Sequence, residues 1–157
     1  MPVSLTQPEL FHPFVRATED VFRTMLASSC KAGDWQAIAD QPPQGELAAW
    51  VYLRGQVTGE VTFHTQSDAA FRIVERMTGL PADELDELVF DSVREMANMI
   101  GGHGKRELET LRLNLGLPQF ELRPAQRTRQ FREHVWIPFE TDLGWCGIEI
   151  GFHPNGA

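Results

Sequence analysis

The sequence predicts an α+β fold, in which a long helix and accompanying helices pack on a mostly antiparallel sheet. Two segments, near the N-terminus and in the middle of the chain, carry apolar residues at the three- and four-residue intervals of amphipathic helices. Runs with the period-two pattern of strands lie before and after the second segment. No repeat, low-complexity segment or linker divides the chain, so residues 1–157 are expected to form a single domain.

The first part of the chain is expected to hold one helix and one hairpin. Helical spacing over residues 9–31 predicts the helix, with Pro13 in its first turn. Residues 35–39 are interpreted as a short edge strand. Strands at 47–53 and 60–64, joined by a glycine-containing turn, then form the hairpin.

A second helix is expected to follow the hairpin. Ser67 or Asp68 would cap its N-terminus, and Gly79 would end it after Thr78. Residues 81–87 are interpreted as a short acidic helical turn that leads into the longest helix.

The longest helix is expected to extend until Gly116 and Pro118 close it. Placing successive residues about 100° apart gathers its apolar positions into one arc. These positions are Val89, Val93, Met96, Ala97, Ile100, Leu108, Leu111 and Leu115. Gly101, Gly102 and Gly104 lie within the helix, where each costs about 1 kcal/mol relative to Ala. Gly104 points into the apolar arc, so we expect it to let the helix approach the sheet.

The pattern changes from helical to period two after the long helix. Phe120 and Leu122 alternate with polar neighbours. Residues 134–141 and 145–152 are predicted strands joined by a tight turn, and the residues from Pro154 are expected to be frayed. Three strands therefore follow the helices.

Composition excludes several classes of function. The formal net charge of −8 argues against a nucleic-acid partner or an anionic membrane surface, which are bound by clustered Lys and Arg. No apolar run has the length of a membrane span, and no signal-peptide pattern opens the chain. We therefore expect a cytoplasmic protein.

Motifs for metal, nucleotide and covalent chemistry are not found. Cys30 and Cys146 belong to no Cys-x-x-Cys pair, and the histidines lack ligand spacing, so no metal site is expected. The glycines around His103 do not follow a strand, as a dinucleotide fingerprint requires. Ser92 lacks a nucleophile elbow.

A polar stripe lies opposite the apolar arc of the long helix. It consists of Asp91, Glu95, Asn98, Gly102 and Lys105, with Glu95 and Asn98 one turn apart. An exposed Glu is usually only solvated, whereas Asn is a poor residue for a helix interior. Gly102 would let the backbone of another molecule come close. The stripe is a candidate site that folding alone does not require.

The segment DSVREMANMIGGHGK at residues 91–105 resembles the CheX branch of the CheC/CheX/FliY family of bacterial phosphatases. The shared pattern is Glu-x-x-Asn, followed by an apolar pair, a Gly and a Lys. Looser agreement extends over residues 55–61, 69–79 and 135–150. The chain departs from the pattern at His103, where the family commonly has Asn, and in a more polar strand after Pro118.

This resemblance implies a CheC-like fold and a phosphatase that hydrolyses the aspartyl phosphate of a CheY-like receiver domain, in chemotaxis or two-component signalling. Asn98 would orient the attacking water, and Glu95 would dock against the receiver's Lys. Asp91, Gly102 and Lys105 would be peripheral partner contacts. The resemblance implies no cofactor on this chain, because Mg²⁺ is expected on the partner receiver domain.

The resemblance also bears on the number of sites and on assembly. The CheC branch has a second Glu-x-x-Asn, but the counterpart here ends in Phe22, which implies a single site per chain. A homodimer built by pairing sheet edges is implied, with the final strands as candidates. The alternative is a non-catalytic module that binds a response regulator or signalling partner. A third reading, a small-molecule sensor, would need a deep apolar pocket.

Overall fold

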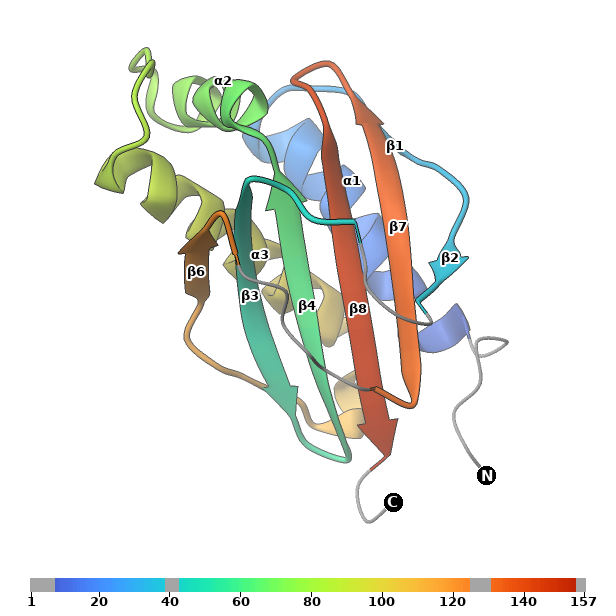
Figure 1. The fold of residues 1–157 in the computed structure, drawn as a ribbon. Helices are drawn as coiled ribbons and strands as arrows, with labels where there is room; N and C mark the ends of the chain where they lie inside the picture. The colour runs from blue at the N-terminus through green and yellow to red at the C-terminus, as the bar shows by residue number, and fades with distance from the viewer. Residues whose placement is uncertain (1–7, 39–42, 125–130, 155–157) are drawn as a thin grey trace.

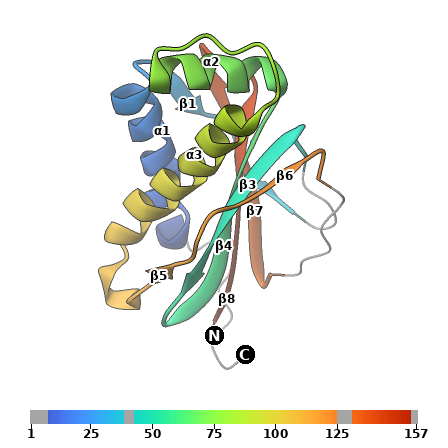
Figure 2. The ribbon, with the colours of Figure 1, turned by 90° about the vertical axis from the view of Figure 1, so that its left-hand side faces the viewer.

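A computed structural model describes residues 8–38, 43–124 and 131–154. Three α-helices cover one face of a curved antiparallel sheet, as Figures 1 and 2 show. The helices are α1 (His12–Met25), α2 (Ser67–Thr78) and α3 (Glu87–Arg106). A short 3-10 turn at Pro8–Leu10 precedes α1, and another at Glu109–Leu111 follows α3. The predicted α+β class is confirmed.

The described residues form eight strands in one sheet, with the order β1-β7-β8-β4-β3-β5. β2 also pairs with β7, and β6 also pairs with β3. The strands are β1 (Cys30–Ala32), β2 (Gln36–Ala37), β3 (Leu47–Arg54), β4 (Val57–Thr65), β5 (Asn114–Leu115), β6 (Gln119–Leu122), β7 (Glu133–Thr141) and β8 (Cys146–Pro154). All pairs are antiparallel.

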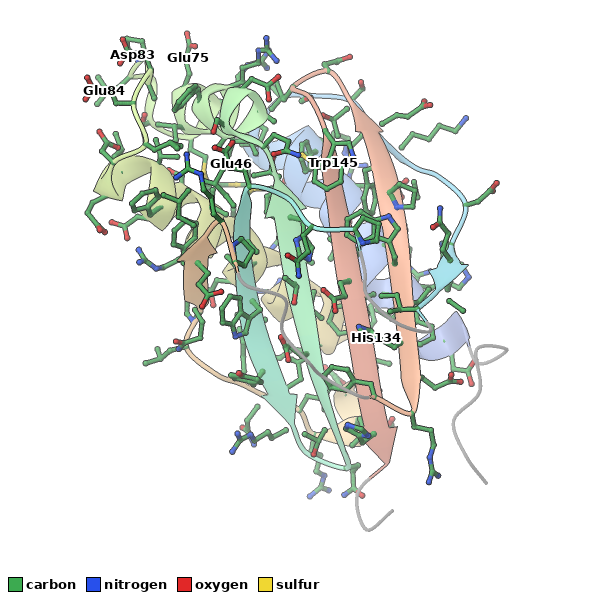
Figure 3. The ribbon with its side chains drawn as sticks, viewed as in Figure 1. Glu46, Glu75, Asp83, Glu84, His134 and Trp145 are labelled. Atoms are coloured by element: carbon green, nitrogen blue, oxygen red, sulfur yellow. The ribbon has the colours of Figure 1, made fainter. Side chains whose placement is uncertain are left out.

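Alternation along the long strands separates an apolar face from a polar one. Leu47, Ala49, Val51 and Leu53 of β3 are buried in the hydrophobic core beneath the helices. The intervening residues face away from the helices, as His134 and Trp145 do in Figure 3. On that face several polar residues are nonetheless buried: Glu60, Thr62, His64, His134 and Glu149.

Glu149 of β8 connects the strands on either side of it. Its Oε1 lies 3.0 Å from Nε2 of His64 on β4, and its Oε2 lies 2.6 Å from Nε2 of His134 on β7. The backbone N–H of Gly45 donates to Nδ1 of His64 at 3.3 Å. Since that N–H can only donate, Nε2 of His64 carries the proton and donates to Glu149. This cluster holds the buried polar face together.

The first helix is shorter than expected, because the prediction of a helix over residues 9–31 extended it too far. The helix ends at Met25, and Ala27 has a left-handed φ of 46° that the helix cannot continue through. Cys30 to Ala32 then pair with β7 as strand β1. Pro13 lies in the first turn, as predicted.

The segments around α3 also differ from expectation. Residues 81–86 are irregular and form no helical turn, and α3 itself begins at Glu87. The helix was predicted to run to Gly116 but ends at Arg106. Arg112 adopts a left-handed φ of 51°, and Leu115 pairs with Leu53 of β3. The apolar residues beyond Arg106 keep helical spacing in the sequence, but strand pairing at Leu115 takes the place of the predicted helix there.

The two hairpins agree with the prediction apart from their ends. The first returning strand begins at Val57 and not at Glu60, because the turn is shorter than expected. The final hairpin turns at Gly144, which has a φ of 132°. Residues 155–157, expected to be frayed, lie outside the described part of the chain.

The ends of α2 show how the chain uses distant groups for capping. Gly79 ends the helix with a φ of 76°, as predicted. At the other end the N-cap position is Gln66, not Ser67 or Asp68. The carboxylate of Glu46 accepts from the backbone N–H and from the hydroxyl of Ser67. A residue before β3 thus supplies the cap.

The last two strands, β7 and β8, do not form a free sheet edge, so they are wrong as candidates for dimer pairing. β8 lies between β4 and β7, and β7 is bordered by β1 and β2. In the described residues the outer edges belong to β1 and β2 on one side and to β5 and β6 on the other. None of the helices in the described ranges could cross a membrane.

Candidate functional site

Helix α3 is held in place at both ends and along its buried face. The side chain of Asp86 accepts from the backbone N–H of Val89 at 3.2 Å and caps the N-terminus. His103, Lys105 and Arg106 lie in the last turn, where cations complement the helix dipole. The predicted apolar arc from Val89 to Ile100 is buried. Its opposite side is therefore fixed toward solvent.

Two of the three helix glycines are explained by packing. A Cβ on Gly101 would come within 2.6 Å of Cγ2 of Val51, so this glycine lets α3 approach the sheet. A Cβ on Gly104 would overlap the ring of Phe14 of α1. Gly104 lies on the buried side of α3, as predicted, but the element that it lets the helix approach is α1 and not the sheet.

Gly102 is different, because the fold does not need a glycine there. The nearest atom that its Cβ would meet is Cδ2 of Leu115 at 3.9 Å, an ordinary contact. Gly102 is half-buried and lies one turn beyond Asn98 on the outward side. A glycine here costs helix stability without improving packing, which is consistent with the approach of another molecule.

Glu95 and Asn98 lie on the outward side of α3, one turn apart. Glu95 is exposed and Asn98 is half-buried. Neither side chain has a hydrogen bond or an ion pair to any other residue within the described ranges. The carboxamide can donate to and accept from one water, and the carboxylate can pair with a cation. The pair is thus available to an incoming surface.

The other two predicted site residues with polar side chains already have partners. Asp91 is exposed, and its Oδ1 accepts from Nη1 of Arg94 at 2.6 Å. Lys105 is half-buried, and its Nζ lies 3.5 Å from the carbonyl oxygen of Leu113. Asp91 and Lys105 thus have partners within this chain, unlike Glu95 and Asn98.

Sequence reasoning missed the residues beside the stripe that brace it. The guanidinium of Arg94 lies 5.3 Å from the ring centroid of Phe120 on β6 and 3.7 Å from Glu87. The ring of Phe120 also stacks on Phe90, with centroids 4.7 Å apart. The spacing of Asp91 and Arg94 is a signal for their ion pair. No sequence signal pointed to Phe120, which lies on another element.

The counterpart of the motif on α1 cannot present the same groups. Phe22 is fully buried and lies beside Phe63, with ring centroids 6.4 Å apart. A carboxylate oxygen of Glu19 accepts from the backbone N–H of Ala32 at 3.2 Å. Both residues of α1 therefore serve the fold.

Possible metal ligands and one pocket bear on two other classes of function. In the described ranges no group of three or more His, Cys, Asp and Glu side chains could hold a metal ion. A pocket at the sheet edge has a volume of about 220 Å³. Its lining is Tyr52, Arg54, Asn114, Leu115 and Gly116. Small-molecule sites usually have about 300–1,000 Å³, so this pocket does not favour the sensor reading.

Solved structures of known proteins share this fold. Chemotaxis protein CheX from Vibrio vulnificus has a TM-score of 0.81 and 24% identity, over 92% of this chain and 99% of that chain. CheX from Desulfovibrio desulfuricans has a TM-score of 0.81 and 23% identity, over 92% and 99% of the two chains. A CheX-CheY-BeF3-Mg²⁺ complex from Borrelia burgdorferi has a TM-score of 0.77 and 18% identity, over 92% and 97%.

Comparison of the sequence itself gives the family. No curated protein matches the chain. The family model for the chemotaxis phosphatase CheX matches residues 47–140, which is more than half of the chain and includes all of α3. The chain therefore belongs to the CheX family of chemotaxis phosphatases.

Proposed function

We propose that this protein accelerates hydrolysis of the aspartyl phosphate on a CheY-like receiver domain, with Asn98 as the water-orienting residue and Glu95 as the docking residue. Membership of the CheX family supports a phosphatase. The similar fold of a CheX that forms a complex with CheY supports the partner class. The observation that carries the assignment is the unpartnered pair Glu95 and Asn98 on the outward side of α3.

The chemistry asks for positioning more than for a strong base. Water attacks the phosphorus, the bond from phosphorus to the aspartyl oxygen breaks, and inorganic phosphate and the free Asp carboxylate are released. The transition state is loose, with charge spread over the phosphoryl oxygens, so the attacking water needs little deprotonation. The carboxamide of Asn98 would hold that water in line, and positioning of this kind can contribute several kcal/mol.

Glu95 would fix the orientation of the two proteins. Its carboxylate is exposed and can accept charge-assisted hydrogen bonds from the receiver's Lys. Gly102 leaves room for the partner's backbone beside Asn98. Asp91 and Lys105 would lie at the margin of the contact. The receiver would supply Mg²⁺, and this chain would bind no cofactor.

One site per chain is part of the proposal, because Phe22 and Glu19 on α1 are occupied by the fold. A homodimer remains a prediction. If it forms by pairing sheet edges, it would use the side of β1 and β2 or the side of β5 and β6. Light scattering coupled to size-exclusion chromatography at micromolar concentration tests it, and a monomer would contradict it.

The direct test mixes the protein with a phosphorylated CheY-type receiver and follows the loss of phosphate. We expect acceleration by the wild type, little or none by Asn98→Ala, and an intermediate loss with Glu95→Ala through weaker docking. Glu75→Ala, which removes an exposed acid of α2 outside the polar stripe, is the control and should leave the rate close to wild type.

The same assay discriminates the non-catalytic alternative. A binding module would retain affinity for the receiver without accelerating hydrolysis, and Glu95→Ala would reduce affinity alone. An Asn98→Ala variant as active as the wild type would contradict the assigned mechanism.

A further inference from the structure

We infer that Leu117, on the sheet edge beside α3, is an apolar anchor of the surface that docks the receiver domain. The inference rests on the proposed function, because it assigns a second part to the same contact. Leu117 is 82% exposed, the highest value among the large hydrophobic residues in the described ranges. A single exposed Leu is ordinary on a protein surface. Leu117 differs in two ways: it lies beside the candidate site, and hydrogen bonds hold the backbone on both sides of it.

The segment that carries Leu117 passes alongside the site. It connects β5 and β6, which both pair with β3. At one end Leu115 lies against Gly101, with Cδ1 2.9 Å from where a Cβ would be. At the other end Phe120 lies beneath Arg94. Asn98 lies between Arg94 and Gly101 on α3, so the segment from Leu115 to Phe120 passes next to it. Figure 2 shows this segment running beside the helix.

Leu117 is held in place by bonds on both sides of it. The backbone N–H of Gly116 donates to the carbonyl oxygen of Tyr52 at 2.8 Å. Gln119 is in register with Trp50 of β3, and its Nε2 lies 3.4 Å from the carbonyl oxygen of Leu117. Pro118 restricts the backbone of the residue before it to extended conformations. The backbone that carries Leu117 is therefore already ordered, and a partner has only the rotamers of the exposed side chain left to order.

The area that a stable protein–protein contact buries indicates that the receiver domain would cover Leu117. Stable contacts bury about 800 Å² on each partner, which is far wider than the outward strip of one helix. A receiver domain centred on Asn98 must therefore extend over a flank of α3. The fully buried part of such a contact is rich in apolar side chains, whereas the polar stripe of α3 supplies none. Leu117 supplies an exposed apolar side chain on the sheet-edge flank. The surface between it and the polar stripe is continuous, because Leu115 lies next to Gly102.

The test measures binding of the full chain to a CheY-type receiver treated with beryllium fluoride and Mg²⁺, together with kcat and KM for the phosphorylated receiver. We expect Leu117→Ser to weaken binding and to raise KM by about tenfold, because burying one Leu side chain is worth at least that factor. The value of kcat should not change. Leu80→Ser is the matched control, since Leu80 is 58% exposed in the connection between α2 and α3.

The outcomes separate this inference from the proposed function. Leu117→Ser binding as tightly as the wild type would overturn the inference and leave the phosphatase proposal intact. Weaker binding by Leu117→Ser, with no acceleration by the wild type, would support the anchor and overturn the catalytic role. A wild type that does not bind the receiver would overturn both. A change of oligomeric mass with unchanged receiver binding would assign Leu117 to a contact between copies and overturn the inference.

Discussion

Gly104 of α3 lies directly against the ring of Phe14 of α1, so closely that a Cβ on residue 104 would overlap ring carbons. Phe14 is fully buried, so the ring cannot move into solvent. We predict that Gly104→Ala lowers the free energy of unfolding by about 1–3 kcal/mol, because overpacking outweighs the gain in helix propensity. Urea denaturation monitored by circular dichroism measures the change.

Gly102→Ala is the matched control for that substitution. A Cβ there meets nothing closer than 3.9 Å, so Ala should raise the free energy of unfolding by up to about 1 kcal/mol. Opposite signs at two glycines of one helix are the expected result. A similar shift at both positions would show that packing against Phe14 does not limit residue 104.

Hydrophobic periodicity located the buried side of α3 but not its end. Positions from Val89 to Ile100 are buried as predicted. The same spacing continues through Leu108, Leu111 and Leu115, yet the helix stops at Arg106. Leu115 still packs on the core, but it does so from strand β5. Periodicity reports that a residue is buried, and pairing with a distant strand decides the local conformation.

The sequence also predicted one part of the candidate site and missed another. The outward placement of Glu95 and Asn98 follows from angular position on one helix, so it was predictable. The contacts of Arg94 with Phe120, and of Gly104 with Phe14, join elements that are remote in the sequence. No spacing rule within α3 could have located them, because they depend on how the helix lies on its neighbours.

The buried Glu149 should be important for stability. Its two oxygens accept from His64 and His134, and all three side chains are buried. Glu149→Gln replaces one acceptor by an NH₂ group that faces an N–H donor. We expect a loss of about 1–3 kcal/mol in the free energy of unfolding, since a buried donor loses its acceptor. Thermal unfolding at neutral pH measures it.

Glu140→Gln is the control for Glu149→Gln, because Glu140 is an exposed residue of β7. It should shift the free energy of unfolding by no more than about 0.5 kcal/mol. An equally small effect of Glu149→Gln would mean that the histidine facing the new NH₂ group finds another acceptor.

Glu133 predicts a pH dependence of stability. Its Oε1 is buried without a hydrogen-bond partner in the described part of the chain, and burial raises the pKa of this carboxyl above its ordinary value of 4.5. The folded state therefore binds the proton more tightly than the unfolded state. This contribution to stability is present below pH 4.5 and is lost as the pH rises through the folded-state pKa.

Removing that charge should stabilise the protein at neutral pH. We expect Glu133→Gln to raise the free energy of unfolding by about 1 kcal/mol at pH 7, because a buried unpaired charge becomes a neutral amide. The difference from wild type should vanish near pH 4. Urea titrations at several pH values measure it, and a difference that grows toward acidic pH would contradict the assignment.

The two cysteines are expected to be unreactive in the folded protein. Burial raises the pKa of the Cys146 thiol to about 11 and raises that of Cys30 above its ordinary value. Only the thiolate attacks a disulfide reagent, so native thiols should react at least about 100-fold more slowly at pH 8 than after unfolding in urea. Labelling with Ellman's reagent measures both rates. Rapid reaction of the native protein that persists in Cys30→Ser would contradict the burial of Cys146.

Gly102 connects the geometry of α3 to the proposed function. The Cβ of a Leu at this position would make only an ordinary contact with Leu115, and the rest of the side chain would add bulk to the helix surface one turn beyond Asn98. Gly102→Leu should therefore leave the fold at least as stable as the wild type. It should raise KM for the phosphorylated receiver by about tenfold or more, because it keeps the partner's backbone at a distance from the helix. A receiver assay combined with urea denaturation measures both quantities. A stable Gly102→Leu variant with wild-type KM would mean that the partner does not approach α3 at this turn, and that the glycine has no role in docking.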